Sequence, residues 1–118
     1  MRNFGLIGQT LSHSFSKDYF NKKFETENID AFYSNFELDN ISSLRSLFSD
    51  FKLSGLNVTI PFKEKVISQL DSLDDISQDL GAVNTIKPFF KNNQLISLKG
   101  YNTDVHGFKQ MVKPYLES

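Results

Sequence analysis

The chain has 118 residues, of which 39% are hydrophobic and 23% are charged, with a formal net charge of −1. This length fits one domain, and the aromatic content of twelve Phe and four Tyr excludes an intrinsically disordered chain. Because Lys and Arg are scattered, apolar runs are short and cysteine is absent, we do not expect nucleic-acid binding, a membrane span, or disulfide or thiolate chemistry.

Two strands and a helix are expected in the first third of the chain. Residues 4–8 form a short apolar run bounded by glycines, which predicts a buried strand. The apolar residues within 16–28 have helical spacing, and Ser16 is a candidate for the N-cap of this helix. Apolar residues at even spacing in 31–38 predict a second strand.

A second helix and a third strand follow. Asp39 or Asn40 is expected to cap the helix, whose apolar residues form one stripe with helical period: Ile41, Leu44, Leu47, Phe48 and Phe51. Apolar and polar side chains alternate in 56–60, which predicts a strand with Ile60 among the apolar residues of one face. Pro61 is expected to end this strand.

Two short helices are expected over residues 63–70 and 74–80. A hairpin of two strands should follow over 82–89 and 94–99, and a last helix over 104–115. Gly81 should end the second short helix, and the hairpin should turn at 91–93. Because helices alternate with strands, we predict an α/β fold. We expect a three-layer α/β/α sandwich around a mixed, mostly parallel sheet, to which the hairpin adds one antiparallel strand.

Polar residues follow two of the predicted strands. Asn57 and Thr59 share one face of their strand, where they either bond to nearby backbone or bind a ligand. Lys63 follows the exit of that strand, and a solvated surface role is its alternative. Asp104 opens the last helix, where it could be an N-cap. Because ligand sites in open α/β sheets lie beyond the carboxyl ends of strands, Lys63 and Asp104 are candidate acid–base partners.

Three further polar residues are candidates for a binding site. Ser14 and Ser16 lie at the start of the first helix, where they either cap the helix or hold an anion beside its free N–H groups. Asn84 is either a structural bridge or a ligand for hydroxyl groups, because a buried amide must be hydrogen-bonded. His13 and His106 lack the spacing of metal ligands, so no metal site is expected.

Two kinds of sequence signal are missing. No glycine-rich G-x-G-x-x-G loop follows a predicted strand, so we expect no dinucleotide-binding site in these residues. No apolar segment typical of a secretory signal follows Met1, so the expected location is cytoplasmic.

Five segments, in order, resemble the shikimate dehydrogenase family. They are residues 5–8 (GLIG), 11–16 (LSHSFS), 55–63 (GLNVTIPFK), 81–85 (GAVNT) and 100–104 (GYNTD), the last followed by Gly107 and Phe108. The resemblance covers residues 4 to about 108 and implies that residues 1–118 are a substrate-binding catalytic domain. It further implies reduction of 3-dehydroshikimate to shikimate with NADPH, a step in aromatic amino-acid biosynthesis.

The resemblance also implies roles for the candidate residues. Ser14 and Ser16 would hold the carboxylate of the substrate. Lys63, hydrogen-bonded to Asp104, would donate and accept the proton. The ring hydroxyls would be bound by the remaining polar residues and by the same carboxylate: Asn57, Thr59, Asn84 and Asp104.

Two features depart from the family pattern. Lys17 stands where members usually have Pro, which should loosen the start of the first helix slightly. Members are also much longer, so we expect the NADP-binding Rossmann domain to be absent from these residues and the fragment alone to be inactive. The alternatives are a stand-alone module that binds shikimate-like or quinate-like hydroxy acids, and a paralogue that uses NAD. An isolated domain could also self-associate into a homo-oligomer.

Overall fold

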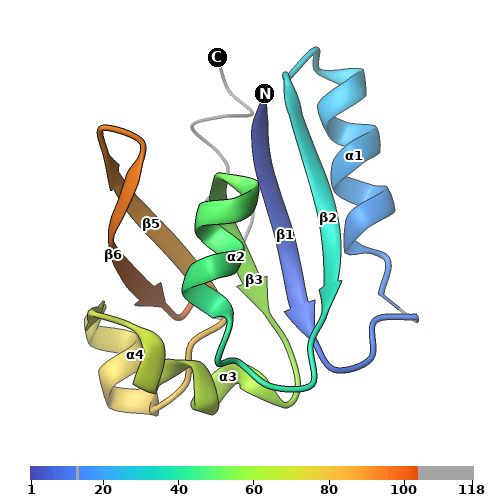
Figure 1. The fold of residues 1–118 in the computed structure, drawn as a ribbon. Helices are drawn as coiled ribbons and strands as arrows, with labels where there is room; N and C mark the ends of the chain where they lie inside the picture. The colour runs from blue at the N-terminus through green and yellow to red at the C-terminus, as the bar shows by residue number, and fades with distance from the viewer. Residues whose placement is uncertain (13, 104–118) are drawn as a thin grey trace.

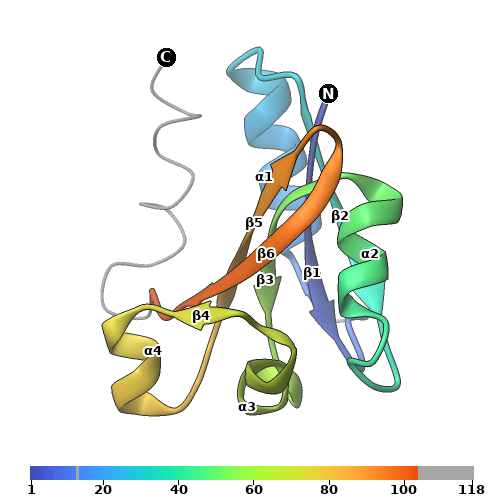
Figure 2. The ribbon, with the colours of Figure 1, turned by 60° about the vertical axis from the view of Figure 1, so that its left-hand side comes forward.

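The computed structural model describes residues 1–12 and 14–103. They form a six-stranded mixed sheet in the order β2-β1-β3-β5-β6-β4 (Figures 1 and 2). The strands are β1 (Arg2–Gly8), β2 (Ala31–Glu37), β3 (Leu53–Val58), β4 (Ser72–Leu73), β5 (Thr85–Lys91) and β6 (Gln94–Tyr101). The helices are α1 (Ser16–Thr26), α2 (Leu44–Phe51), α3 (Phe62–Lys65) and α4 (Asp75–Leu80), with a 3₁₀ turn at Val66–Gln69.

The sheet is mostly parallel. β1 is parallel to β2 and β3, and β4 is parallel to β6, whereas β5 is antiparallel to both of its neighbours. All described strands except β5 therefore run the same way, as the sequence predicts. The carboxyl ends of β1, β2, β3 and β6 lie at one edge of the sheet, where α3 and α4 are also found (Figure 1). We call this edge the carboxyl edge.

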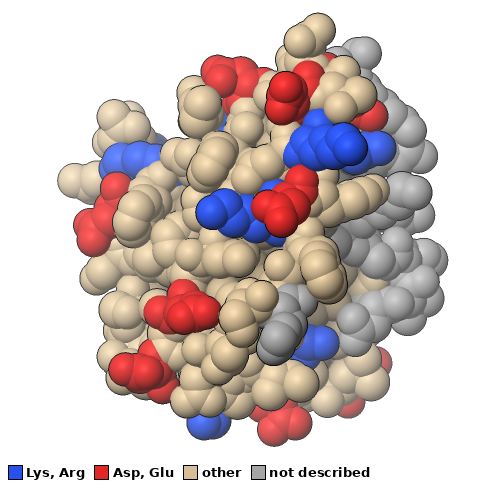
Figure 3. All heavy atoms as spheres, turned by 90° about the vertical axis from the view of Figure 1, so that its right-hand side faces the viewer, with Lys and Arg blue, Asp and Glu red and all other residues tan. Residues whose placement is uncertain are grey.

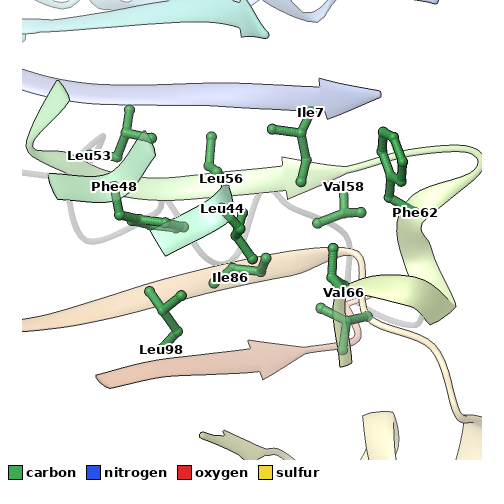
Figure 4. Close-up of a cluster of buried hydrophobic side chains, with 11 residues drawn as sticks. Ile7, Leu44, Phe48, Leu53, Leu56, Val58, Phe62, Val66, Ile86 and Leu98 are labelled. Atoms are coloured by element: carbon green, nitrogen blue, oxygen red, sulfur yellow. The ribbon is translucent and has the colours of Figure 1, made fainter. Parts of the chain in front are cut away.

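Helices cover both faces of the sheet, so β1 has buried side chains on both of its sides. Ile7 belongs to the larger core, together with the fully buried Leu44 and Phe48 of α2 (Figure 4). Phe4 and Leu6 belong to a second apolar cluster, beneath α1. Successive strand residues point to opposite faces, so α1 and α2 lie on opposite sides of the sheet (Figure 2). The predicted three-layer α/β/α sandwich is confirmed.

Two local predictions in the second half of the chain are confirmed. The Asp74 carboxylate accepts a hydrogen bond from the backbone N–H of Ser77 at 2.8 Å, and α4 ends at Gly81 in the left-handed region, with φ 64°. The β5–β6 hairpin turns at Asn92 and Asn93, whose φ values are 53° and 65°. Asn tolerates this conformation better than most residues, so the turn follows from the local sequence.

The end of β3 differs from the prediction. The strand ends at Val58, and Ile60, expected on the buried face, is 77% exposed. The backbone N–H of Thr59 still donates to the carbonyl of Ile7 at 3.0 Å, but the Thr59 carbonyl then accepts from Phe62 at 3.0 Å. The chain therefore turns away from the sheet before Ile60, although the alternation of apolar and polar residues continues to Ile60, beyond the end of the strand.

Two other elements also differ from the prediction. α2 begins at Leu44, later than expected, because the side chain of Asn40 accepts from the backbone N–H of Ser42 at 3.0 Å and closes a separate turn first. The strand β4 is missing from the prediction. It has only two residues, Ser72–Leu73, which is too short for a recognisable pattern, and it forms by pairing with β6.

The distribution of surface charge and the hydropathy of the helices agree with what the composition of the chain predicts. On the face shown in Figure 3, which includes α1, the Lys and Arg side chains are interspersed with Asp and Glu. That face has no continuous positive stripe of the kind that follows a phosphate backbone. No helix among the described residues is long and apolar enough to cross a membrane.

The carboxylate of Asp71 connects β6 to the segment that precedes β4. Its ionisation should therefore affect the stability of the fold. Its carboxylate accepts from the backbone N–H of Leu98 at 2.7 Å and from Arg45 at 2.9 Å. The Leu98 bond first, and then Arg45, hold the pKa of Asp71 below its ordinary value. Such a group stabilises the fold above its unfolded pKa of about 4, and this stabilisation is lost as the pH falls through the lower folded pKa.

We therefore expect Asp71→Asn to flatten the decline in the free energy of unfolding below about pH 4. Urea unfolding of both proteins over a series of pH values measures this effect. Equal pH dependence in the two proteins would contradict the role assigned to the Asp71 carboxylate.

Candidate functional site

The loop between β1 and α1 carries Ser14 and Ser16 to the carboxyl edge. The backbone N–H of Leu11 donates to the carboxylate of Glu37 at 3.0 Å, which ties the loop to the end of β2. The backbone N–H of Ser14 donates to the carbonyl of Leu11 at 3.0 Å, and that of Ser16 lies 3.4 Å from the Ser14 hydroxyl oxygen. The two serines are thus held together at the start of α1.

The start of α1 corrects one prediction. The N-cap is Phe15, which makes no side-chain cap bond, so Ser16 is the first helical residue and not the cap. The helix forms with Lys17 in its first turn, so the proline usual at this position is not required for the helix to begin there.

Tyr33 is a site residue that the sequence analysis missed. It lies on β2 with 0% of its surface exposed, and its hydroxyl oxygen accepts a hydrogen bond from Nδ2 of Asn57 at 2.8 Å. Burial raises the pKa of Tyr33, and the hydrogen bonds with Asn57 and Ser16 oppose that rise, so the hydroxyl stays protonated at neutral pH. A tyrosine inside a mostly apolar strand needs a polar partner, which was the available signal.

Thr59 and Lys63 lie where the chain leaves β3. Thr59 is half-buried, and its side chain packs against Gly8, where a Cβ atom would lie 2.7 Å from it. Lys63 is the second residue of α3, and its carbonyl accepts from the backbone N–H of Val83 at 2.8 Å. The Lys63 side chain is half-buried and makes no salt bridge with another described residue.

Asn84 joins the start of β5 to the chain that leaves β6. Its Oδ1 accepts from the Thr85 hydroxyl at 3.1 Å and from the backbone N–H and hydroxyl of Thr103 at 3.0 and 3.2 Å. Its backbone N–H donates to the carbonyl of Tyr101 at 3.0 Å. Asn84 therefore acts as the structural bridge that was one of its two alternatives. Asp104, which follows Thr103, lies outside the described residues, as do His13, His106 and the last predicted helix.

The structure thus brings together most of the predicted site. The serine loop, the end of β3, the start of β5 and the end of β6 all lie at the carboxyl edge, where Tyr33 is bonded to Asn57 and Asn84 is bonded to Thr103. Polar side chains gathered where parallel strands end are typical of α/β domains that bind a small polar ligand.

Comparison with known proteins identifies the domain more closely. The family model for the shikimate dehydrogenase substrate binding domain matches residues 6–86. A shikimate dehydrogenase (NADP(+)) from Clostridium perfringens (strain SM101 / Type A) is 42% identical over 116 residues, which are 96% of this chain and 41% of the relative. The chain belongs to the shikimate dehydrogenase family, and it corresponds to the substrate-binding domain of that family.

Solved structures agree. Shikimate dehydrogenase 1 from Peptoclostridium difficile is 40% identical, with a TM-score of 0.78 over 97% of this chain and 41% of that one. The enzyme from Thermus thermophilus, solved with NADP(H) and shikimate, is 27% identical, with a TM-score of 0.74 over 97% of this chain and 42% of that one. The chain spans about 41% of the length of these curated relatives from Clostridium perfringens.

The glycines of β1 do not form a phosphate cradle for a dinucleotide. A phosphate cradle after β1 needs glycines that let backbone N–H groups approach the phosphates. Here a Cβ at Gly8 would lie 2.7 Å from the side chains of Leu11 and Thr59, and one at Gly5 would lie 2.6 Å from the ring of Phe36. These glycines therefore allow side-chain packing and do not open space for a ligand. Among the described residues there is also no cluster of three or more metal-ligating side chains.

Proposed function

We propose that this chain is the substrate-binding domain of an NADP-dependent shikimate dehydrogenase, which interconverts 3-dehydroshikimate and shikimate in the biosynthesis of aromatic amino acids. The observation that carries the proposal is that the serine loop at the start of α1 and the polar side chains at the end of β3 lie at the carboxyl edge of a domain of this family. NADP would be bound by a part of the complete protein other than the described residues.

The serine loop is proposed to bind the carboxylate of the substrate. Ser14 and Ser16 lie at the start of an eleven-residue helix, where backbone N–H groups and the helix dipole favour a negative charge. The Glu37 carboxylate is bonded to Leu11 at the other end of the loop, so it fixes the loop without occupying the serine hydroxyls. A hydroxylated carboxylic acid is the class of ligand that suits this arrangement.

The ring hydroxyls of the substrate are proposed to meet the side chains on the other side of the site. Asn57 and Thr59 lie on and just beyond β3, and Asn84 precedes β5, so the three surround the end of β3. Asp104 is assigned to the same group on the family pattern, and Asn84 supports this assignment because it anchors the preceding residue, Thr103.

Lys63 is proposed to transfer the proton. When the ketone is reduced, its oxygen gains negative charge, and an ammonium group beside that oxygen stabilises the charge and supplies the proton. The bond from Val83 to the Lys63 carbonyl fixes the start of α3, so the side chain begins from a rigid position. Asp104 is the proposed partner that orients the ammonium group.

We also infer that the protein works in the cytoplasm, which its similarity to shikimate dehydrogenases supports. Association with a second copy of the chain stays a prediction.

Titration of shikimate into the purified 118-residue chain, followed by NMR or calorimetry, tests the substrate class. We expect saturable binding that Ser14→Ala weakens about ten-fold, as loss of a hydrogen bond to a charged group typically does. Asp104→Ala should also weaken it. Ser46→Ala, which removes an exposed hydroxyl from α2 on the opposite face, is the matched control and should leave binding unchanged. Absence of a saturable response in the unmodified chain would refute the assignment.

A further inference from the structure

The side chain of Asn21 bonds to the backbone of the edge strand β2. This strand pairs with β1 on one side only, because it is the first strand in the order of the sheet. On its other side, the backbone N–H of Tyr33 donates to Oδ1 of Asn21 at 2.8 Å, and the Tyr33 carbonyl accepts from Nδ2 of the same side chain at 2.9 Å. The Asn21 amide therefore takes the place that a neighbouring strand would have at this residue.

These two bonds fix the orientation of the Asn21 amide. A backbone N–H only donates and a backbone carbonyl only accepts, so Oδ1 and Nδ2 cannot exchange places. The ring of Phe20, the preceding residue of α1, stacks on the Tyr33 ring with centroids 5.1 Å apart and planes at 25°. The two contacts together oppose both sliding of α1 along β2 and rotation of α1 about its own axis.

A further bond holds the loop that precedes α1 to the same strand. The backbone N–H of Leu11 donates to Oε1 of Glu37 at 3.0 Å, and Glu37 is the last residue of β2. Tyr33 and Glu37 are four residues apart, which corresponds to about 13 Å along a strand, so the two attachments are well separated. The serine loop lies in sequence between Leu11 and Asn21, so the segment that carries it is attached to β2 at both ends.

The placement of α1 determines where the serine loop presents its polar groups. Asn21 comes five residues after Ser16, so it lies only about 7.5 Å further along the helix axis. A shift or rotation of α1 at Asn21 would therefore move the first turn, whose backbone N–H groups and dipole favour a negative charge. Oδ1 and Nδ2 of Asn21 are both bonded to β2, so this side chain acts through the helix.

We propose that β2 positions the serine loop through two positioning residues, Asn21 and Glu37, and so aligns Ser14 and Ser16 with the carboxylate of the substrate. Asn21 sets the place of α1 on the sheet, and Glu37 holds the other end of the loop. The inference rests on the proposed function and adds two residues that lie outside the five segments of the family resemblance.

Asn21→Leu removes both bonds to β2 with little change in side-chain volume. In the complete enzyme we expect it to raise KM for shikimate about ten-fold and to change kcat by less than about two-fold, because binding of a charged group weakens while Lys63 is untouched. Phe24→Leu is the matched control, because it removes a ring from the apolar cluster beneath the same helix. It should lower the melting temperature and leave KM unchanged.

Glu37→Ala tests the other attachment without altering the interior, because Glu37 is exposed. We expect KM for shikimate to rise about five-fold, as loss of one hydrogen bond typically allows. Glu37→Gln is the matched control, because it loses the same negative charge but keeps a side-chain oxygen that can accept from Leu11. Its KM should stay within about two-fold of the unmodified value, since the bond to the loop is kept.

The methyl ester of shikimate separates positioning of the serine loop from a general effect on the site. It keeps the ring hydroxyls but lacks the negative charge that the serine loop is proposed to meet. The factor by which Asn21→Leu or Glu37→Ala raises KM should therefore be smaller for the ester than for shikimate.

An unchanged KM in both Asn21→Leu and Glu37→Ala overturns the inference while the proposed function stands, and so does an equal rise in KM for the ester and for shikimate. If Asn21→Leu does not fold, equal KM values in Glu37→Ala and Glu37→Gln overturn the inference. If the unmodified enzyme neither binds nor converts shikimate, the proposed function fails, and this inference fails with it. These results are distinguishable because the unmodified enzyme is measured first.

Discussion

Lys63→Ala is expected to lower kcat of the complete protein by about 10²- to 10⁴-fold, the usual cost of losing a general acid–base group. The ammonium group is proposed to supply the proton to the oxygen of the reacting ketone. It lies at the carboxyl edge, on a helix whose start is fixed by the bond between Val83 and the Lys63 carbonyl. Because that bond involves only backbone, alanine should retain it and the local fold.

Steady-state kinetics with saturating substrate measures this effect. Lys65→Ala is the matched control, because Lys65 lies on the same short helix, is exposed, and has no proposed contact with the substrate. Its kcat should stay within about two-fold of the unmodified value. If Lys63→Ala retains most of the rate while its melting temperature is unchanged, Lys63 does not transfer the proton.

Phe48→Ala is expected to lower the free energy of unfolding by about 3 to 5 kcal/mol. Phe48 is fully buried at the centre of α2, where it packs among the side chains of the larger core (Figure 4). Truncation leaves a cavity that rigid strands on one side and the helix on the other cannot close. Single domains are typically stable by only about 5 to 15 kcal/mol, so a large part of the stability would be lost.

Urea unfolding of the 118-residue chain measures this change. Phe51→Ala is the matched control, because Phe51 is the same residue type on the same helix but is 51% exposed. Its ring contacts Phe36 at the margin of the core, with ring centroids 5.1 Å apart. Its loss of stability should be less than half that of Phe48→Ala. Equal losses of stability in the two variants would mean that Phe48 is not buried between α2 and the sheet as described.

The site residues differ in how far the sequence could identify them. Ser14, Asn57, Thr59 and Lys63 stand next to the ends of predicted strands, so their location at the carboxyl edge followed from chain order and parallel pairing. Tyr33 was missed because Asn57, the hydrogen-bond partner of its hydroxyl, is 24 residues away along the chain. No local pattern shows that a side chain reaches over a neighbouring strand.

The structure adds to what the sequence predicts for Ser16 and Asn84. Capping and ligand binding are both reasonable for a serine at a helix start, and the helix begins at Ser16 with Phe15 as its N-cap, so Ser16 does not cap it. Asn84 bridges to Thr103, and its binding of substrate hydroxyls stays a prediction. The bridge of Asn84 depends on a partner that is distant in the chain.

The sequence by itself determined the α/β class, the mostly parallel sheet with one antiparallel strand, and local stops such as Gly81 and Asn92, because these depend on periodicity and on the conformational preference of single residues. Only the tertiary structure decided where β3 ends, that Ser72–Leu73 pairs with β6, and which polar groups satisfy one another. The physical reason is that a buried hydrogen bond or a short strand depends on a partner distant in the chain. Only folding brings that partner near.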